Sequence, residues 1–301
     1  MHIPHIPVLK DEVLSVFADI KTGYIIDCTL GYGGHSEALL QHNLHVKLIC
    51  CDQDAEAIAF SKKRLEAYGD RVIFEHAKFS SIIALYKDYD IRGVLADIGV
   101  SSLQLDHNSR GFGFESAVLD MRMNPQNPLN ASEVVNTYSI TQLEEILREY
   151  GEMRNAKEVA RAIVANRPFE SAKELADIMQ SFNSKPKIHP ATLLFQAIRI
   201  EVNDELGELD ELLRSIEVAK LKNTLIAIIS FHSLEDRIVK RTFQAWSKNC
   251  ICPPSLMRCI CGNDHAIGKI ISKKPIIPSV KEQKKNPRSR SAKMRVFRTF
   301  K

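Results

Sequence analysis

Glycines at positions 31, 33 and 34 follow an apolar segment that ends at Asp27, and a helix-forming segment begins near Ser36. This order predicts a strand, a tight turn and a helix. Glycine lets a backbone approach a ligand closely, and the first turn of the following helix offers unpaired amides and the positive end of its dipole. The turn therefore suits a nucleotide or another charged cofactor.

A second signal follows at Asp52. Gly31-x-Gly33 opens like the dinucleotide fingerprint, but Ser36 stands where the third glycine belongs. The next apolar segment ends at Asp52, about twenty residues on, where a carboxylate can accept hydrogen bonds from ribose hydroxyls. The alternatives are a glycine turn without a ligand and an ordinary acid before a helix. Together the two signals favour a cofactor that contains a nucleoside.

Strand and helix segments alternate from residue 24 to residue 99. The predicted strands are 24–28, 46–52, 71–75 and 93–98. Such alternation is typical of a parallel sheet covered by helices on both faces, with ligands at the carboxyl ends of its strands. The side chains expected at that edge are Asp27, Asp52, Phe79 and Asp97.

Residues 105–214 differ in character, because helical segments follow one another there without a strand. Thr141 with Glu144 and Ser171 with Glu174 have the spacing of capping boxes. A stretch of about a hundred residues is the usual size of a small domain. We therefore expect a discontinuous α/β domain, residues 1–104 and 215–301, and an inserted all-helical domain, residues 105–214.

Strand character returns at 224–230, and His232 follows in a strand-to-helix turn. Ser233 and Asp236 have the spacing of a capping box at the start of the next helix. His232 is a candidate general base, because it follows a central strand. A structural, hydrogen-bonded histidine is the alternative.

The net charge of +4 conceals an uneven distribution. Residues 269–301 contain twelve Lys or Arg and one acid, so this segment carries +11 and the rest of the chain −7. It includes most of two expected edge strands, 268–271 and 294–300. Its composition indicates contacts with nucleic-acid phosphates along a strand edge, and a solvated, mobile tail is the alternative.

Four of the seven cysteines form a compact set, Cys250-x-Cys252 and Cys259-x-Cys261. Four thiolates suit zinc, but paired zinc ligands are usually separated by two to four residues rather than by one. We assign no metal from the sequence. Zinc, with His265 as a substitute ligand, and a reduced loop both remain open.

The remaining cysteines lie in predicted buried strands, which favours a reducing compartment. The longest apolar run, 224–230, is far shorter than a membrane span, and the first residues contain no apolar signal core. We therefore expect a globular, cytoplasmic protein.

Eight motifs occur in order along nearly the whole chain. They are Gly31-Tyr-Gly-Gly-His-Ser36, Asp97-Ile-Gly-Val-Ser-Ser-x-Gln104, Arg110-Gly-Phe-Gly-Phe114, Leu119-Asp-Met-Arg-Met123, Tyr150-Gly-Glu152, His189-Pro-Ala-Thr-x-x-Phe-Gln-Ala-Ile-Arg-Ile-x-Val-Asn203, Ile229-Ser-Phe-His-Ser-Leu-Glu-Asp-Arg-Ile-Val-Lys240 and Asn286-Pro-Arg-Ser-Arg-Ser291. In order and spacing they resemble the bacterial 16S rRNA (cytosine-N4) methyltransferases, the MraW family.

The resemblance implies a class I S-adenosylmethionine-dependent methyltransferase core, a Rossmann-like parallel sheet, with an inserted helical domain that recognises RNA. It implies methyl transfer from S-adenosylmethionine to the exocyclic N4 of a cytidine in 16S rRNA, C1402 of the decoding centre. The expected substrate form is the assembled small ribosomal subunit.

The resemblance also assigns roles to residues. The implied cofactor contacts are Gly33, Gly34, His35, Asp52, Phe79, Asp97 and Gln104. The cytosine amine has its lone pair delocalised into the ring, so the reaction mainly requires acceptors that orient it. Many amino-methyltransferases use an Asp or Asn followed by two prolines and an aromatic residue, whereas this chain has Asp97-Ile-Gly-Val. We predict Asp97 as the catalytic acceptor, followed by His232 and Asn203.

Two other functions compete with this interpretation. Gly31-x-Gly33 with Asp52 also fits a nicotinamide-dependent oxidoreductase. A ribosome-assembly factor that keeps the fold without the activity would share every motif. The sequence shows no self-complementary apolar stripe that would indicate an oligomeric state.

Overall fold

The computed structural model describes residues 7–100, 104, 108–182, 189–253, 255–256 and 258–300. The chain forms two compact units, the first comprising Met1–Gly99 with Gly207–Lys301 and the second Val100–Leu206. The second unit is shorter at its end than the expected insertion, residues 105–214. Most of helix α11 (Glu205–Ala219) belongs to the first unit, because Leu209, Leu212 and Ile216 pack in the core of the sheet.

The first unit contains a seven-stranded sheet in the order β3-β2-β1-β4-β5-β7-β6. Strands β1 to β5 are parallel to one another, and β7 runs antiparallel to both β5 and β6. The strands are β1 (Tyr24–Asp27), β2 (Lys47–Asp52), β3 (Val72–His76), β4 (Ile91–Asp97), β5 (Leu225–Ser230), β6 (Gly268–Ile270) and β7 (Lys293–Thr299). The predicted parallel strands are confirmed to within about two residues.

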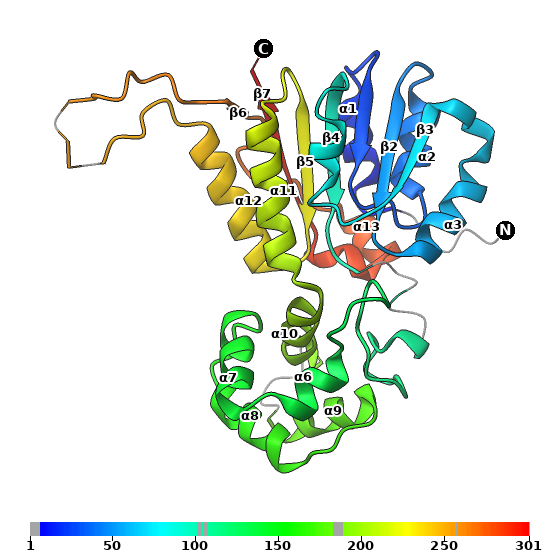
Figure 1. The fold of residues 1–301 in the computed structure, drawn as a ribbon, viewed down its shortest axis with the longest axis vertical. Helices are drawn as coiled ribbons and strands as arrows, with labels where there is room; N and C mark the ends of the chain where they lie inside the picture. The colour runs from blue at the N-terminus through cyan, green and yellow to red at the C-terminus, as the bar shows by residue number, and fades with distance from the viewer. Residues whose placement is uncertain are drawn as a thin grey trace. The chain divides into compact units, whose positions relative to one another are not determined.

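Helices cover both faces of this sheet (Figure 1). Side chains alternate along each strand, so that Ile25 packs with one layer of helices and Ile26 with the other. The first layer consists of α1 (Lys10–Phe17), α2 (Gly34–His42) and α3 (Ala55–Arg64), and the second of α4 (Ile82–Tyr86), α11 and α12 (Ser233–Trp246). The short elements η1 (Glu66–Arg71), α13 (Val280–Lys285) and η4 (Pro287–Ser291) complete the unit.

The basic C-terminal segment is folded into the sheet. The expectation that 294–300 forms an edge strand is wrong, because β7 lies between β5 and β6 and most of it is buried. Arg295 is buried and makes a two-pronged contact with Asp236, with Nε 2.6 Å from Oδ1 and Nη2 3.1 Å from Oδ2. The mobile-tail alternative is likewise wrong for residues 268–300.

The second unit is helical, and its described residues contain no strand. Its elements are η2 (Asn108–Arg110), α6 (Ala131–Thr137), α7 (Ile140–Glu149), α8 (Ala156–Ala165), α9 (Ala172–Ile178), η3 (Met179–Phe182) and α10 (Thr192–Asn203). Leu143, Ile146 and Leu147 recur at helical spacing on α7 and are buried in its core.

The predicted capping boxes have mixed outcomes. Ser171 and Glu174 form the predicted box at the start of α9. The box predicted from Thr141 and Glu144 is wrong, because α7 begins two residues earlier and is capped by Ser139 and Gln142.

In the part of the chain that the structure describes, no helix is both long enough and apolar enough to cross a membrane.

Candidate cofactor-binding and active site

Four parallel strands end in polar residues at one edge of the sheet. Asp27, Asp52, Asp97 and Ser230 are the last residues of β1, β2, β4 and β5. The chain leaves β1 toward β2 on one side and returns to β4 on the other, so the strand order reverses between β1 and β4. Ligands of open α/β sheets bind at such a switch point, outside the carboxyl ends of the strands.

The glycine turn lies at this switch point. Gly31 and Gly33 have φ angles of 49° and 71°, left-handed values that glycine adopts without strain. Helix α2 begins directly after Gly33, which has no side chain to cap it, so among the described residues the amides of its first turn have no cap side chain as acceptor. A Cβ at Gly31 would meet nothing within 4 Å, whereas one at Gly34 would come 2.5 Å from Pro7 Cγ. A ligand can therefore approach the turn beside Gly31.

Asp27 and Ser36 stabilise the turn from inside. The Ser36 hydroxyl donates to Asp27 Oδ2 at 2.6 Å, and both residues are buried. Burial raises the pKa of Asp27, and the hydrogen bond from Ser36 opposes this rise. The contact explains why a serine stands where the dinucleotide fingerprint has its third glycine.

Asp52 supports the same turn from β2. Its Oδ2 accepts a hydrogen bond from the Gly31 amide at 2.8 Å, and its Oδ1 accepts one from the Asp54 amide at 2.9 Å. Burial raises the pKa of Asp52 to about 6, although these two hydrogen bonds lower it. A carboxylate has about four acceptor positions, so both oxygens can also accept from ribose hydroxyls.

His35 and Asp97 form a pair with unused hydrogen-bonding capacity. His35 Nε2 lies 3.4 Å from Asp97 Oδ2, and the His35 side chain is buried. Among the described residues, neither ring nitrogen of His35 nor Asp97 Oδ1 has a hydrogen-bond partner. Thr29 Oγ1 accepts from the Asp97 amide at 2.7 Å and so fixes the end of β4 beside the turn. Buried polar atoms are normally paired, so this pair suits a charged ligand.

Phe79 follows β3 and is partly buried against the sheet. Its neighbours are held by α11: Lys78 Nζ lies 2.5 Å from Glu208 Oε1, and Ser80 Oγ donates to Glu208 Oε2 at 2.5 Å. The residue is thus placed at the same edge as Asp52, where an aromatic ring can pack against a base.

His232 caps α12. Its Nδ1 accepts a hydrogen bond from the Glu235 amide at 3.4 Å, and its Nε2 lies 3.0 Å from Glu235 Oε1. Glu235 Oε2 in turn accepts from the Phe231 and His232 amides. The capping box predicted at Ser233 and Asp236 is therefore wrong by one residue. The Nδ1 atom therefore has a structural role in the cap, whereas Nε2, although close to Glu235 Oε1, makes no hydrogen bond among the described residues. The structure thus supports the structural role for one ring nitrogen and leaves the general-base role of the other open to test.

Two variants separate these roles. His232→Asn keeps a side-chain acceptor that is preferred at helix starts, and we expect it to retain most of the activity. His232→Ala removes the acceptor and should destabilise the protein by about 1 kcal/mol. Thermal unfolding and single-turnover rates measure the two effects. A loss of about a hundredfold or more in the rate of folded His232→Asn would instead indicate general-base catalysis.

Two further predicted residues, Gln104 and Asn203, belong to the second unit. Gln104 is buried. Asn203, at the end of α10, accepts from the Met123 amide at 2.8 Å and donates to the carbonyls of Met121 and Arg199 at 2.8 and 2.9 Å. Its amide group therefore holds the motif 119–123 against α10, which favours a positioning role for this predicted catalytic residue.

The structure also reveals an aromatic pair that sequence reasoning missed. Phe114 stacks on His189 with ring centroids 4.1 Å apart and planes 11° apart. The His189 side chain is exposed. Phe114 ends the motif 110–114, and His189 begins the motif 189–203. Because the two residues are far apart in the chain, no spacing pattern predicts that they stack.

The mostly parallel seven-stranded sheet, with β7 antiparallel between β5 and β6 and the glycine turn after β1, has the Rossmann-like fold of class I methyltransferases. The methyl donor is S-adenosylmethionine. The chain belongs to the MraW methylase family, whose sequence model matches residues 2–300. This membership excludes the nicotinamide-dependent oxidoreductase.

Two relatives cover almost the whole chain. A protein of Aliarcobacter butzleri named ribosomal RNA small subunit methyltransferase H is 65% identical over 298 residues, 99% of each chain. The protein of the same name from Sulfurimonas denitrificans is 59% identical over 300 residues, 98% of each chain. The solved structure of an rRNA methylase from Streptococcus thermophilus covers 99% of both chains, with 9% identity and a TM-score of 0.42, which is too distant to bear on function.

Proposed function

We propose that this protein transfers a methyl group from S-adenosylmethionine to the exocyclic N4 of a cytidine in 16S rRNA, C1402 of the decoding centre. The relatives' name supports small-subunit rRNA as the substrate class. The observation that carries the proposal is that, in the described part of the chain, both ring nitrogens of His35 and the Oδ1 atom of Asp97 have no hydrogen-bond partner, beside a helix start that has no side-chain cap.

The residues at the carboxyl edge fit the cofactor. Asp52 accepts from the ribose hydroxyls, Phe79 packs on the adenine, and the turn 31–34 accommodates the amino-acid end. His35 donates to the cofactor carboxylate, and Asp97 faces its cationic groups. When bound there, S-adenosylmethionine supplies an activated methyl group. We extend the cofactor set to Gln104 on the family resemblance alone.

Asp97 has a second task at the target base. Its carboxylate accepts a hydrogen bond from the cytosine amine, which orients the nitrogen and stabilises the positive charge that develops on it. No strong base is required for this role. Asn203 acts indirectly, by holding residues 121–123 in place.

Basic residues emerge at the same edge of the sheet. Because β7 is antiparallel to β5, its first residue, Lys293, pairs with Ser230 at the carboxyl edge, and α13 and η4 directly precede it. Glu282 on α13 accepts a hydrogen bond from the Leu9 amide at 2.8 Å. Leu9 is two residues from Pro7, and Pro7 packs near Gly34 of the glycine turn. The exposed basic side chains of this surface, which we call the α13 surface, are Lys281, Lys284, Lys285, Arg288 and Arg290. We assign them to RNA phosphates.

Removing three of these charges tests the assignment. The variant Lys284→Ala/Lys285→Ala/Arg290→Ala should bind small subunits at least about tenfold more weakly, and the slope of log K against log salt should fall in magnitude by about 2. Filter binding over a salt series measures both quantities, while the affinity for S-adenosylhomocysteine should not change.

A matched control removes equal charge from the opposite edge. The three residues removed are exposed lysines. Lys63 lies in the last turn of α3, Lys87 directly follows α4, and Lys222 lies shortly before β5. Their triple alanine variant should keep the original salt slope. Equal losses in both variants would show that net charge, rather than the α13 surface, determines RNA affinity.

The second unit is proposed as the RNA-recognition domain. The cytosine amine of a stacked duplex is inaccessible, so the target must be unpaired or extruded, and aromatic side chains commonly hold such bases. The stacked Phe114 and His189 offer such a surface. The assembled small subunit is the proposed substrate form, which places the reaction in the cytoplasm.

The decisive experiment uses small subunits from a strain that lacks the gene. Incubation with the protein and isotopically labelled S-adenosylmethionine should place one label in 16S rRNA, and nucleoside mass spectrometry should identify it as N4-methylcytidine. Label at cytosine C5, or in another nucleotide, would contradict the proposed atom. Subunit binding without label would favour the assembly factor that lacks the activity.

A further inference from the structure

The described residues between α12 and β6 form no apolar core of their own. Figure 1 shows it in orange as a long excursion from the end of α12. None of its described residues from 247 to 267 is buried, and Ile251 and Ile260 expose 62% and 79% of their surface. A loop of this length without secondary structure is uncommon in a compact domain. Some interaction other than apolar packing must therefore hold this segment in one conformation.

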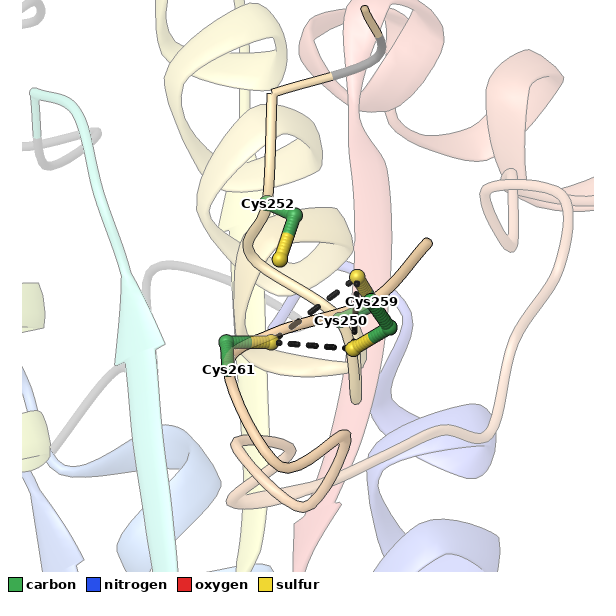
Figure 2. A group of neighbouring side chains, drawn as sticks. All are labelled: Cys250, Cys252, Cys259 and Cys261. Atoms are coloured by element: carbon green, nitrogen blue, oxygen red, sulfur yellow. Dashed lines mark hydrogen bonds between the residues drawn. The ribbon is translucent and has the colours of Figure 1, made fainter. Parts of the chain in front are cut away.

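Four thiols meet within this segment (Figure 2). The Sγ atoms of Cys250, Cys252, Cys259 and Cys261 all lie within 4.8 Å of one another. Three of the separations are 3.6 Å for Cys250–Cys259, 3.5 Å for Cys259–Cys261 and 3.8 Å for Cys250–Cys261. Zinc with Zn–S bonds of about 2.3 Å has neighbouring sulfurs about 3.8 Å apart in a tetrahedron. The thiols are thus close to the positions that one zinc ion requires.

Other uses of four cysteines fit less well. All four are free, and three of the sulfurs form a near-equilateral triangle rather than disulfide-forming pairs. An iron–sulfur cluster distributes its thiolates over several iron atoms and needs them farther apart.

The local backbone also suits thiolate ligands. Ile260 donates its amide to Cys252 Sγ at 3.4 Å. Gly262 and Asn263, with φ angles of 87° and 60°, turn the chain directly after Cys261. His265 Nε2 lies 2.7 Å from the Cys261 carbonyl oxygen, so this ring is engaged elsewhere and does not join the thiols. A backbone amide that donates to a ligand sulfur, as that of Ile260 does, stabilises the sulfur and orients it.

We propose that Cys250, Cys252, Cys259 and Cys261 bind one structural zinc ion, which fixes the segment between α12 and β6. Four protein ligands close the coordination sphere, so the ion has no open position for catalysis. The site is independent of the methyl-transfer proposal, because it uses none of the residues at the carboxyl edge.

The test uses the full chain, purified under reducing conditions without added metal or chelator. Elemental analysis should find about one zinc per chain, and an organomercurial that blocks thiols should release it. The double variant Cys252→Ser/Cys259→Ser should lose the zinc. Ile260→Ser, which introduces serine between two ligands without removing a thiol, should keep it. Loss of zinc should speed proteolytic cleavage between residues 247 and 267, while circular dichroism of the helices changes little.

A readout on the unmutated protein covers the case in which the double variant fails to fold. Cobalt exchanged into the wild-type chain should show the intense thiolate-to-metal absorption of a tetrahedral four-sulfur site. Less than about 0.1 zinc per chain, iron in place of zinc, or zinc retained by a folded double variant would overturn the assignment.

Discussion

Replacing Asp97 with asparagine should lower the single-turnover rate of methyl transfer by about 10² to 10³-fold. Asparagine preserves the size of the side chain, but it removes the negative charge and replaces one acceptor oxygen with a donor. Asp97 Oδ1 has no hydrogen-bond partner among the described residues, whereas Oδ2 lies 3.4 Å from His35 Nε2, so thermal unfolding of the variant is measured beside the rate. Rapid-quench measurements with saturating cofactor isolate this effect.

The control is Asp88→Asn, an exposed position at the opposite edge of the sheet, shortly before β4. This variant should react at the wild-type rate. If Asp97→Asn also reacted at the wild-type rate, Asp97 would not be the acceptor. A defect confined to cofactor affinity would assign Asp97 to cofactor binding alone.

Replacing Asp52 with asparagine should raise the Kd for S-adenosylhomocysteine by about 100-fold, or about 2.7 kcal/mol. The carboxylate oxygens that we propose to bind the ribose are also those that hold the Gly31 and Asp54 amides, and the neutral amide group of asparagine has a single acceptor oxygen. Isothermal titration calorimetry measures the loss, and thermal unfolding without ligand shows whether the turn itself is disturbed. An unchanged Kd would remove Asp52 from the cofactor site.

The raised pKa of Asp52 adds a pH dependence to this result. With a pKa of about 6, the carboxyl group is protonated in the free protein as the pH falls below that value. If the ionised form binds the ribose as proposed, the wild-type Kd should rise by up to about tenfold per pH unit below pH 6. Asp52→Asn should show no such slope, and a wild-type Kd that stayed constant between pH 7 and pH 5 would contradict the assignment.

The sequence predicted the parallel part of the fold well, because strand burial and side-chain alternation are local signals. The positions of the glycine turn and of Asp52 followed from the same pattern. The position of β7 did not, because a terminal strand that inserts antiparallel beside β5 depends on contacts with residues about seventy positions away. Arg295 illustrates this, since a basic residue expected at phosphates is buried against Asp236.

The sequence predicted the helix cap at α12 and the meeting of the four cysteines less well. Histidine is not among the preferred residues at helix starts, so the sequence placed the cap of α12 at Ser233 rather than at His232. The meeting of the four thiols depends on how the chain folds back between Cys252 and Cys259, which ligand-spacing rules for adjacent cysteines do not describe.

The direction of β7 has a practical consequence for experiments. The strand begins at Lys293 beside Ser230 and ends toward Phe300, whose carbonyl accepts from the Asn223 amide just before β5. A fluorophore or an immobilising tag attached after β7 therefore leaves the molecule on the side away from the cofactor residues. Surface-based measurements with intact ribosomal subunits are best anchored there.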